Sequence, residues 1–251
     1  MAEFLVLTLA APMASFGELA GHDRRGTRDW PLRSAVLGLL GAAQGIDRHD
    51  EAGQRALGDH GVAVAVHASG RPLRDWHTVQ TVGRTLKRPR SRADALARAG
   101  SALNTTITTR DYRTTVLHRA AIWNGDLAAL AEAIARPHFA LWLGRKACPP
   151  AAPLDPRIVP AADPVQALEA ETLRLPPWAT SADDTQTGDG LDTPWCHLPK
   201  RPVMIASDPW PGLSPDLVET RWDRPTDRRR WHFAPREVHV FHRSNAEEAR
   251  S

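Results

Sequence analysis

The sequence predicts an α+β domain that carries a long insertion. An alternating apolar segment near residue 3 is followed by a small-residue helix, and a second strand and helix pattern resumes after residue 114. More than forty residues, 69–113, separate a predicted second strand from the third. A structureless loop of that length is improbable inside a compact domain, so the insertion is expected to form an element of its own.

The first part of the domain begins with a predicted strand over Glu3 to Ala10, which Pro12 is expected to end. Both faces of this strand are largely apolar, which indicates a central position in a sheet. Ala35 to Ala43 is apolar and rich in small residues, and Gly45 follows it, so we expect a buried helix with a glycine stop. Asp50 to Leu57 predicts a short second helix, and Val62 to Val66 a second strand.

The second part begins with a predicted strand over Thr114 to Trp123. A helix over Asp126 to Arg136 follows, because its apolar residues fall on one face and Pro137 stops it. Strand, helix, strand, insertion, strand and helix is the beginning of a ferredoxin-like arrangement, the fold of RNA-recognition (RRM) modules. The pattern is common and by itself says little about function.

The insertion contains two segments that are suited to pair as strands. Trp76 to Val82 alternates bulky and polar residues, and Leu103 to Thr109 is rich in β-branched residues. We expect them to form a projecting two-stranded arm with a basic tip. The tip would hold Arg84, Lys87, Arg88, Arg90, Arg92 and Arg98.

The last hundred residues predict little regular structure. The chain becomes proline-rich and acidic after Leu143, and residues 176–195 are expected to form a mobile loop. Short strands are expected at Val203 to Ala206, Leu217 to Trp222 and Val238 to His242, followed by a polar tail from Ser244 to Ser251. We therefore expect residues 1–150 to form the domain, with 71–110 as the inserted arm. Residues 151–251 would add the acidic loop and an irregular β-rich part that packs on the same domain.

Charge is distributed unevenly along the chain. Residues 71–119 contain eleven basic and three acidic side chains, whereas residues 150–219 contain four basic and eleven acidic ones. Twenty-nine of the 32 basic residues are arginine, which binds phosphate and stacks on bases better than lysine does. The basic segment is equally consistent with a solvated face. The apolar run Phe4 to Met13 is too short to span a bilayer and has no positive flank, so a cytoplasmic protein is expected.

Motifs for common cofactor-dependent or hydrolytic enzymes are absent from the sequence, and no cofactor or metal is expected. His77 and Tyr112 could supply acid and base groups for metal-independent RNA cleavage, or could bind RNA without cutting it; the binding interpretation is favoured. Trp76 lies in the basic arm, where it could stack on a base or pack against a partner protein. Trp123 and Trp142 lie in apolar stretches and are expected in the core.

Several strings together resemble one family. They are LVLTLAAPMASFG (5–17), LRSAVLGLLGAAQGIDR (32–48), LRDWHTVQTVG (73–83), TTRDYRTTVLHRAAIW (108–123), LWLGRKACPP (141–150) and FAPREVHVF (233–241). In this order they resemble the CasD subunits of Cascade, the type I-E CRISPR RNA-guided surveillance complex, within the RAMP superfamily. Residues 151–230 match only loosely, and Trp76 stands where the family usually has tyrosine.

The resemblance implies a RAMP-type ferredoxin-like domain with a thumb-like β-hairpin. It also implies a non-catalytic subunit that holds the repeat-derived 5′ handle of the CRISPR RNA and caps the backbone filament. The implied partners are CRISPR RNA, the backbone and large subunits of Cascade, and target DNA through the assembled complex, for antiviral defence. The alternatives are a metal-independent CRISPR-repeat endoribonuclease, as in the related type I-C system, and a purely structural adaptor.

The candidate RNA-binding residues share a basic, aromatic or hydroxyl side chain near the first helix, in the arm, or in the segment after residue 144. They are Arg24, Arg25, Arg28, Arg33, Ser34, Trp76, His77, Thr78, Arg84, Lys87, Arg110, Arg145 and Lys146.

Overall fold

A computed structural model describes residues 1–17, 21, 23–82, 89–170, 173–174, 195, 197–227, 230 and 232–243. Three sequence predictions fall outside these residues. They are the positions of Arg84 and Lys87 at the arm tip, nearly all of the acidic loop 176–195, and the tail 244–251.

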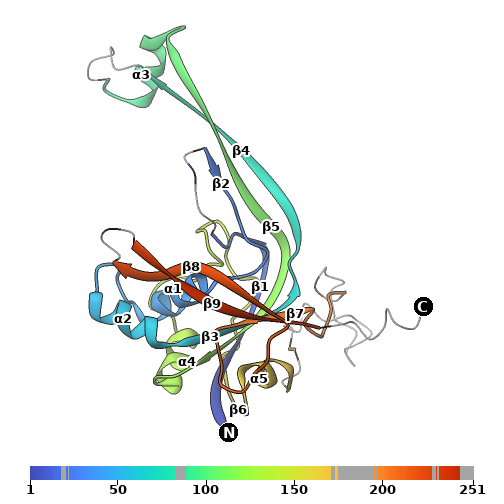
Figure 1. Cartoon of the computed structure of the whole chain (residues 1–251). Coiled ribbons are helices and arrows are strands. Elements are labelled where there is room, and N and C mark those ends of the chain that lie inside the picture. Colours follow the sequence, from blue (N-terminus) through green and yellow to red (C-terminus); the bar gives the residue numbers. More distant parts are fainter. Residues whose placement is uncertain are drawn as a thin grey trace, which may run out of the picture.

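The described part of the chain is a mixed α/β structure built on one large sheet (Figure 1). Along its main path the strand order is β6, β1, β5, β3, β7, β9 and β8, and neighbouring strands are antiparallel. These strands are β1 (Ala2–Ala14), β3 (Gly61–Ala68), β5 (Leu103–Trp123), β6 (Arg157–Ala161), β7 (Met204–Ser207), β8 (Leu217–Asp227) and β9 (His232–His242). The predicted central position of the first strand is confirmed, because β1 lies between β5 and β6.

Helices cover both faces of the sheet. One face is packed by α1 (Arg33–Gln44), α2 (Glu51–Asp59) and α4 (Leu127–Ala135), and the other by α5 (Pro164–Ala170). The alternation of a strand places Leu5 and Leu7 in the first core and Phe4 and Val6 in the second, and all four are almost completely buried. The glycine stop is also confirmed, since Gly45 adopts a φ of 73° and its N–H bonds back to Ala42.

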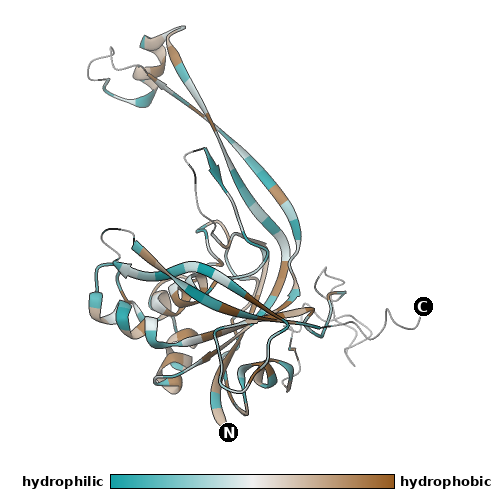
Figure 2. Ribbon diagram, in the orientation of Figure 1, coloured by the Kyte–Doolittle hydropathy of each residue, from teal (hydrophilic) through white to brown (hydrophobic). Residues whose placement is uncertain are grey.

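A long two-stranded ribbon projects from the sheet (Figure 1). β4 (Arg71–Val82) pairs with the first half of β5 from Arg71↔Thr114 to Val82↔Leu103, so β5 runs without a break from the ribbon into the centre of the body. A short strand, β2 (Arg24–Arg25), pairs in parallel with β5 at the ribbon base. The ribbon is coloured mainly hydrophilic in Figure 2. The predicted pairing of the two arm segments is confirmed.

Some elements are longer than expected, and others were not predicted. β1 continues through Pro12, because β6 pairs with β1 only over Ala2–Val6 and leaves Pro12 with a strand on one side. At the far end of the ribbon, α3 (Arg92–Ala99) occupies part of the expected basic tip, and the Ser91 side chain accepts a hydrogen bond from the N–H of Asp94.

Two elements after residue 150, β6 and α5, were not predicted. β6 pairs with β1 and α5 packs on the sheet, while β7, which matches the strand expected at Val203 to Ala206, pairs with β3. Residues 157–170 and 204–207 therefore belong to the same sheet structure as the first 150 residues. β6 is only five residues long and contains Pro160. Such a segment is too short for apolar periodicity to reveal it.

Candidate nucleic-acid interface

The base of the ribbon is three strands wide, and it brings together residues that are far apart in sequence. Arg24 pairs with Thr109 on one side of β5, while Trp76 pairs with the same threonine on the other side. One residue further, Arg110 lies between Arg25 and Asp75. Paired residues of neighbouring strands project to the same face. The three strands therefore place Arg24, Thr109 and Trp76 side by side on one face of the ribbon base, and Arg25, Arg110 and Asp75 side by side on the other.

The first face carries an uncovered aromatic side chain. Trp76 is 66% exposed, and Thr78 and Ile107 form the next pair on the same face. A tryptophan in this environment offers a flat surface on which a nucleobase can stack without regard to its sequence.

Asp111 organises the arginines beside Trp76. Its carboxylate accepts hydrogen bonds from Nε of Arg24 at 2.9 Å and Nε of Arg74 at 2.6 Å. Its pKa is lowered, first by the hydrogen bond from Arg74 and also by the one from Arg24. One carboxylate faces two guanidinium groups, and both arginine side chains remain about half exposed. The cluster therefore keeps a net positive charge and retains donors for a phosphate.

The second face holds Arg25, Arg110 and His77. Nε2 of His77 lies 2.5 Å from Oδ2 of Asp75, which orients the imidazole along β4. Nε of Arg110 is buried and has no hydrogen-bond partner among the described residues. Tyr112 projects to this face as well, but it pairs with Leu73 and so lies four residues, about 13 Å, along the ribbon from His77. The structure does not bring His77 and Tyr112 together as an acid–base pair.

Arg145 joins β2 to β5 at the ribbon base. Its guanidinium donates to the backbone oxygens of Asp111 at 3.0 Å and Arg25 at 2.7 Å, and it lies over the ring of Tyr112 at 4.8 Å. The neighbouring Gly144 packs directly against the backbone of Ser15. It has a φ of 93°, and a Cβ there would lie 1.7 Å from the Ser15 oxygen, so only glycine fits this position. The adjacent Lys146 is exposed and lies 5.8 Å from the ring of Trp142, which is only half-buried. Trp123, in contrast, is buried as expected.

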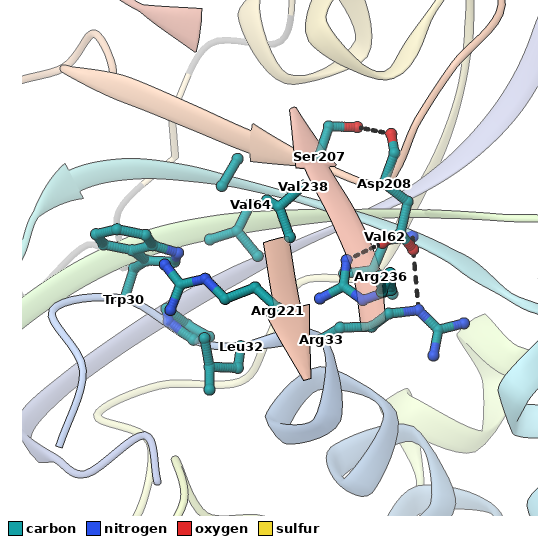
Figure 3. Close-up of a pocket in the computed structure, with 12 residues that line it drawn as sticks. Trp30, Leu32, Arg33, Val62, Val64, Ser207, Asp208, Arg221, Arg236 and Val238 are labelled. Atoms are coloured by element: carbon teal, nitrogen blue, oxygen red, sulfur yellow. Dashed lines mark hydrogen bonds and ion pairs between the residues drawn. The ribbon is translucent and has the colours of Figure 1, made fainter. Parts of the chain in front are cut away.

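Three candidates lie at the start of α1 or in the segment before it, and not in the ribbon. Arg28 and Ser34 are exposed, Arg28 in an isolated bridge with Phe16 and Ser34 in the first turn of α1. Arg33 has internal partners. It donates to Oδ2 of Asp208 at 2.9 Å (Figure 3). It also donates to the backbone oxygens of Gly58 and His60, both at 2.7 Å. The bonds of Arg33 tie α1 to the end of β7 and to the end of α2.

The structure adds Arg74 and Asp111 to the candidate residues. Arg74 precedes Trp76 by two positions, so the period of a strand already places both on one face. The role of Asp111 has no comparable signal, because an acidic residue in a basic segment does not reveal which arginines it contacts.

Two further findings concern metal sites and membrane-spanning helices among the described residues. They contain no group of three or more histidine, cysteine, aspartate or glutamate side chains placed to hold a metal ion. None of the helices among them is both long and apolar enough to cross a membrane.

Comparison with known proteins identifies the family. A family model described as "CRISPR-associated protein (Cas_Cas5)" matches residues 4–239. The CRISPR system Cascade subunit CasD of Escherichia coli strain K12 is 31% identical over 232 residues, which covers 84% of this chain and 95% of that protein.

Two solved structures share the fold. One, titled "CRISPR RNA-guided surveillance complex", has a TM-score of 0.60 at 24% identity and covers 95% of this chain and 89% of the other. The second, titled "Crystal structure of Cas protein", has a TM-score of 0.56 at 21% identity and covers 94% and 93%. Because the family model spans most of the chain and the CasD similarity covers nearly all of that relative, this chain belongs to the Cas5 family of CRISPR-associated proteins.

Proposed function

We propose that this chain is a non-catalytic RNA-binding subunit of a Cascade-type surveillance complex, and that it holds the repeat-derived 5′ handle of the guide RNA. The observation that carries the proposal is the ribbon base, where Trp76 is exposed beside the Arg24, Arg74 and Asp111 cluster. Arginines there would contact phosphates while the tryptophan stacks on a base. The similarity to CasD supports the assignment to such a complex.

The topology supports a RAMP-type interpretation of the fold. β1, α1, β3, β5, α4 and β6 follow one another along the chain, and their strands lie in the order β6, β1, β5, β3. That is the strand order of a ferredoxin-like module, with β6 as the fourth strand. We therefore interpret the β4–β5 ribbon as the thumb of this module. Its position suits a role in separating the handle from the rest of the guide and in capping the backbone filament.

The endoribonuclease alternative has less support. A metal-independent cut needs a base near the attacking 2′-hydroxyl and an acid near the leaving group. His77 is held by Asp75, and Tyr112 lies about 13 Å along the ribbon beneath Arg145, so neither can assist the other. The Asp75–His77 pair alone keeps cleavage as the competing hypothesis.

The test is to introduce 4-azidophenylalanine at position 76 and express the chain with the other subunits of its complex and a CRISPR array. After irradiation, we expect RNA crosslinked to this chain, and sequencing should place the adduct in the repeat-derived 5′ segment. Absence of an RNA adduct, with the complex intact, would support a purely structural adaptor and contradict the proposal.

A second measurement separates binding from cleavage. Purified complex or subunit is incubated with repeat RNA in EDTA, alongside the His77→Ala and Tyr112→Phe variants. We expect intact RNA in every sample. Discrete products that disappear with either substitution would assign the chain as an endoribonuclease.

A further inference from the structure

A pocket of about 440 Å³ lies at the end of the sheet away from the ribbon. The course of β1 places it there, because Ala14 pairs with Arg113 near the ribbon, whereas Ala2 and Glu3, which line the pocket, begin the strand at the other end (Figure 1). The rest of the lining comes from the turn between β5 and α4, the start of α4, β6, and the loop after β7. The pocket is therefore separate from the candidate RNA interface at the ribbon base.

Two tryptophans form the aromatic wall of this pocket. Trp123 and Trp210 both line it, and their ring centroids lie 5.6 Å apart at an interplanar angle of 83°. The buried Phe4 packs against both rings, with centroid distances of 6.0 Å to Trp123 and 5.3 Å to Trp210. Gly61 lies directly against Trp123, since a Cβ there would be 1.9 Å from the indole ring. The core thus fixes the orientation of both indoles before any ligand binds.

The turn beside the tryptophans is also held in place. Asn124 and Gly125 join β5 to α4, and both have a positive φ, of 66° and 78°. The Asn124 side chain donates to the backbone oxygen of Asp59 at 3.2 Å, and the Asn124 backbone oxygen lies 2.7 Å from Nδ1 of His60. The pocket is therefore formed in advance, which reduces the entropy that a ligand loses on binding.

The charged residues that line the pocket are both acidic. Glu3 is exposed and makes no ion pair with the described residues. Asp126 is exposed as well, and its Oδ1 accepts the N–H of Ala129 at 2.9 Å, which leaves Oδ2 available to a ligand. The nearest cation along the chain is the α-amino group of Met1, a residue that is 98% exposed and does not line the pocket. A phosphate would meet two carboxylates here, whereas a guanidinium or ammonium group would gain two carboxylates and the aromatic rings.

The strand beside the pocket is an edge of the sheet. β6 pairs with β1 on one side, and no strand among the described residues pairs with its other side. Ile158 of β6 is 39% exposed and also lines the pocket. A small free cation would leave this edge and this side chain uncovered, whereas a protein chain can contact both while it inserts one side chain. The adjacent edge therefore favours a protein as the source of the cation.

We propose that this pocket receives an arginine or lysine side chain of another protein subunit, whose chain also contacts β6 at Ile158. The carboxylates of Glu3 and Asp126 supply the complementary charge, and Trp123 and Trp210 supply the aromatic contact. The proposal rests on the proposed function only in that the chain works inside a multi-subunit complex. Because the pocket and the ribbon base lie at opposite ends of the sheet, this docking leaves the RNA interface free.

The test places 4-azidophenylalanine at position 158 of the chain in the assembled complex. After irradiation we expect an adduct with a different protein subunit, close to a basic residue of that subunit. Glu3→Lys in the same chain should abolish the adduct, whereas Glu132→Lys should leave it unchanged, since Glu132 is an exposed acidic residue of α4 outside the pocket. An RNA adduct, an adduct with a second copy of this chain, no adduct, or equal effects of the two substitutions would each overturn the proposal.

Neutral substitutions provide an independent measurement. The double variant Glu3→Gln and Asp126→Asn removes both charges, and asparagine preserves the cap of α4. We expect it to lower retention of the crosslinked subunit roughly tenfold at low salt and less at high salt, whereas Glu132→Gln should have no effect. Replacing the partner's basic residue at the adduct with glutamate should restore retention to the Glu3→Lys chain. No restoration, with the urea denaturation of the chain unchanged, would contradict the proposal.

The crosslink at position 76 is read in parallel. An RNA adduct there with no protein adduct at position 158 refutes only this inference, and the reverse result refutes only the proposed RNA role.

Discussion

At the scale of single residues, Trp76 allows the most direct prediction. Its ring is 66% exposed, so truncation to alanine removes a stacking surface and leaves the fold intact. We expect Trp76→Ala to weaken binding of single-stranded repeat RNA by about 1–3 kcal/mol, or roughly five- to 150-fold. Trp222→Ala is the matched control, because Trp222 is 70% exposed but lies on β8, outside the ribbon. Equal losses in both variants, measured by filter binding with the complex, would contradict a stacking role for Trp76.

The arginines illustrate what a sequence can and cannot predict about a site. Arg24, Arg25 and Arg110 meet at the ribbon base, as a basic interface requires. Arg33 and Arg145 are equally basic in the sequence, yet the structure gives both of them internal partners. The difference depends on Asp208, 175 positions after Arg33, and on the backbone oxygen of Asp111. No local pattern encodes such distant partners.

At the scale of elements, the junction between ribbon and body rests on an unusual backbone. Gly70 has a φ of 70°, and a Cβ there would lie 2.0 Å from the Thr114 oxygen; Thr115 opposite has a φ of 57°. We expect Gly70→Ala to lower the free energy of unfolding by about 1–3 kcal/mol, measured by urea denaturation. Gly58→Ala in α2 is the control and should stabilise by up to about 1 kcal/mol, since a Cβ there meets nothing within 4 Å.

The ribbon can also be shortened without changing the pairing of its remaining residues. His77 and Thr108 face each other, so joining them through an Asn-Gly turn removes residues 78–107 and keeps the pairing below. We expect the body to fold with an unchanged melting temperature, because both cores lie outside the removed segment. The same variant keeps the ribbon base with Trp76, so guide-RNA retention should be weakened only in part, whereas docking of the adjacent backbone subunit should be lost. Normal assembly with full-length guide RNA would mean that residues 78–107 are a dispensable insertion.

Helices with a clear apolar periodicity and a glycine or proline at their end were predictable from the sequence. Short elements were less so. The buried helix ending at Gly45 and the helix before Pro137 are found as expected. α3 was not predicted although Ser91 and Asp94 have the spacing of a helix cap, because an eight-residue helix with one buried residue shows too little apolar periodicity. β6 and α5 carry few residues each, and their pairing with distant parts of the sheet decides their structure.

At the scale of the whole molecule, two buried histidines make stability depend on pH. Burial lowers the pKa of His118 to about 3 and that of His67 to about 4. The unfolded chain therefore binds more protons below about pH 6.5, so stability is complete above that value and is lost as pH falls. The expected slope is on the order of 1 kcal/mol per pH unit for each histidine.

This slope can be measured by urea denaturation between pH 7.5 and 5.5. His118→Phe should reduce the slope, because it removes one of the two titrating groups. The fold should tolerate a phenyl ring there, since Phe16 packs edge-on against the ring of His118. An unchanged slope for His118→Phe would show that the acid sensitivity has another source.

The assembled interface should also respond to salt. If about four phosphates are neutralised at the ribbon base, the logarithm of the RNA association constant should fall with log salt at a slope of roughly −3. Arg24→Gln should make the slope shallower by about one charge. The association constant is measured with complexes that contain either the unsubstituted chain or the Arg24→Gln variant. If it does not change with salt in either complex, contacts other than those to phosphates hold the RNA.

The unbroken course of β5 has a mechanical consequence. β5 is one 21-residue strand whose second half pairs with β1 and β3 in the body and whose first half belongs to the ribbon. The ribbon is therefore a cantilever that is anchored in the centre of the sheet. A load at its tip acts as a torque on Gly70 and Thr115, both of which have a positive φ. A partner protein that bound the far end would thereby set the orientation of the entire body.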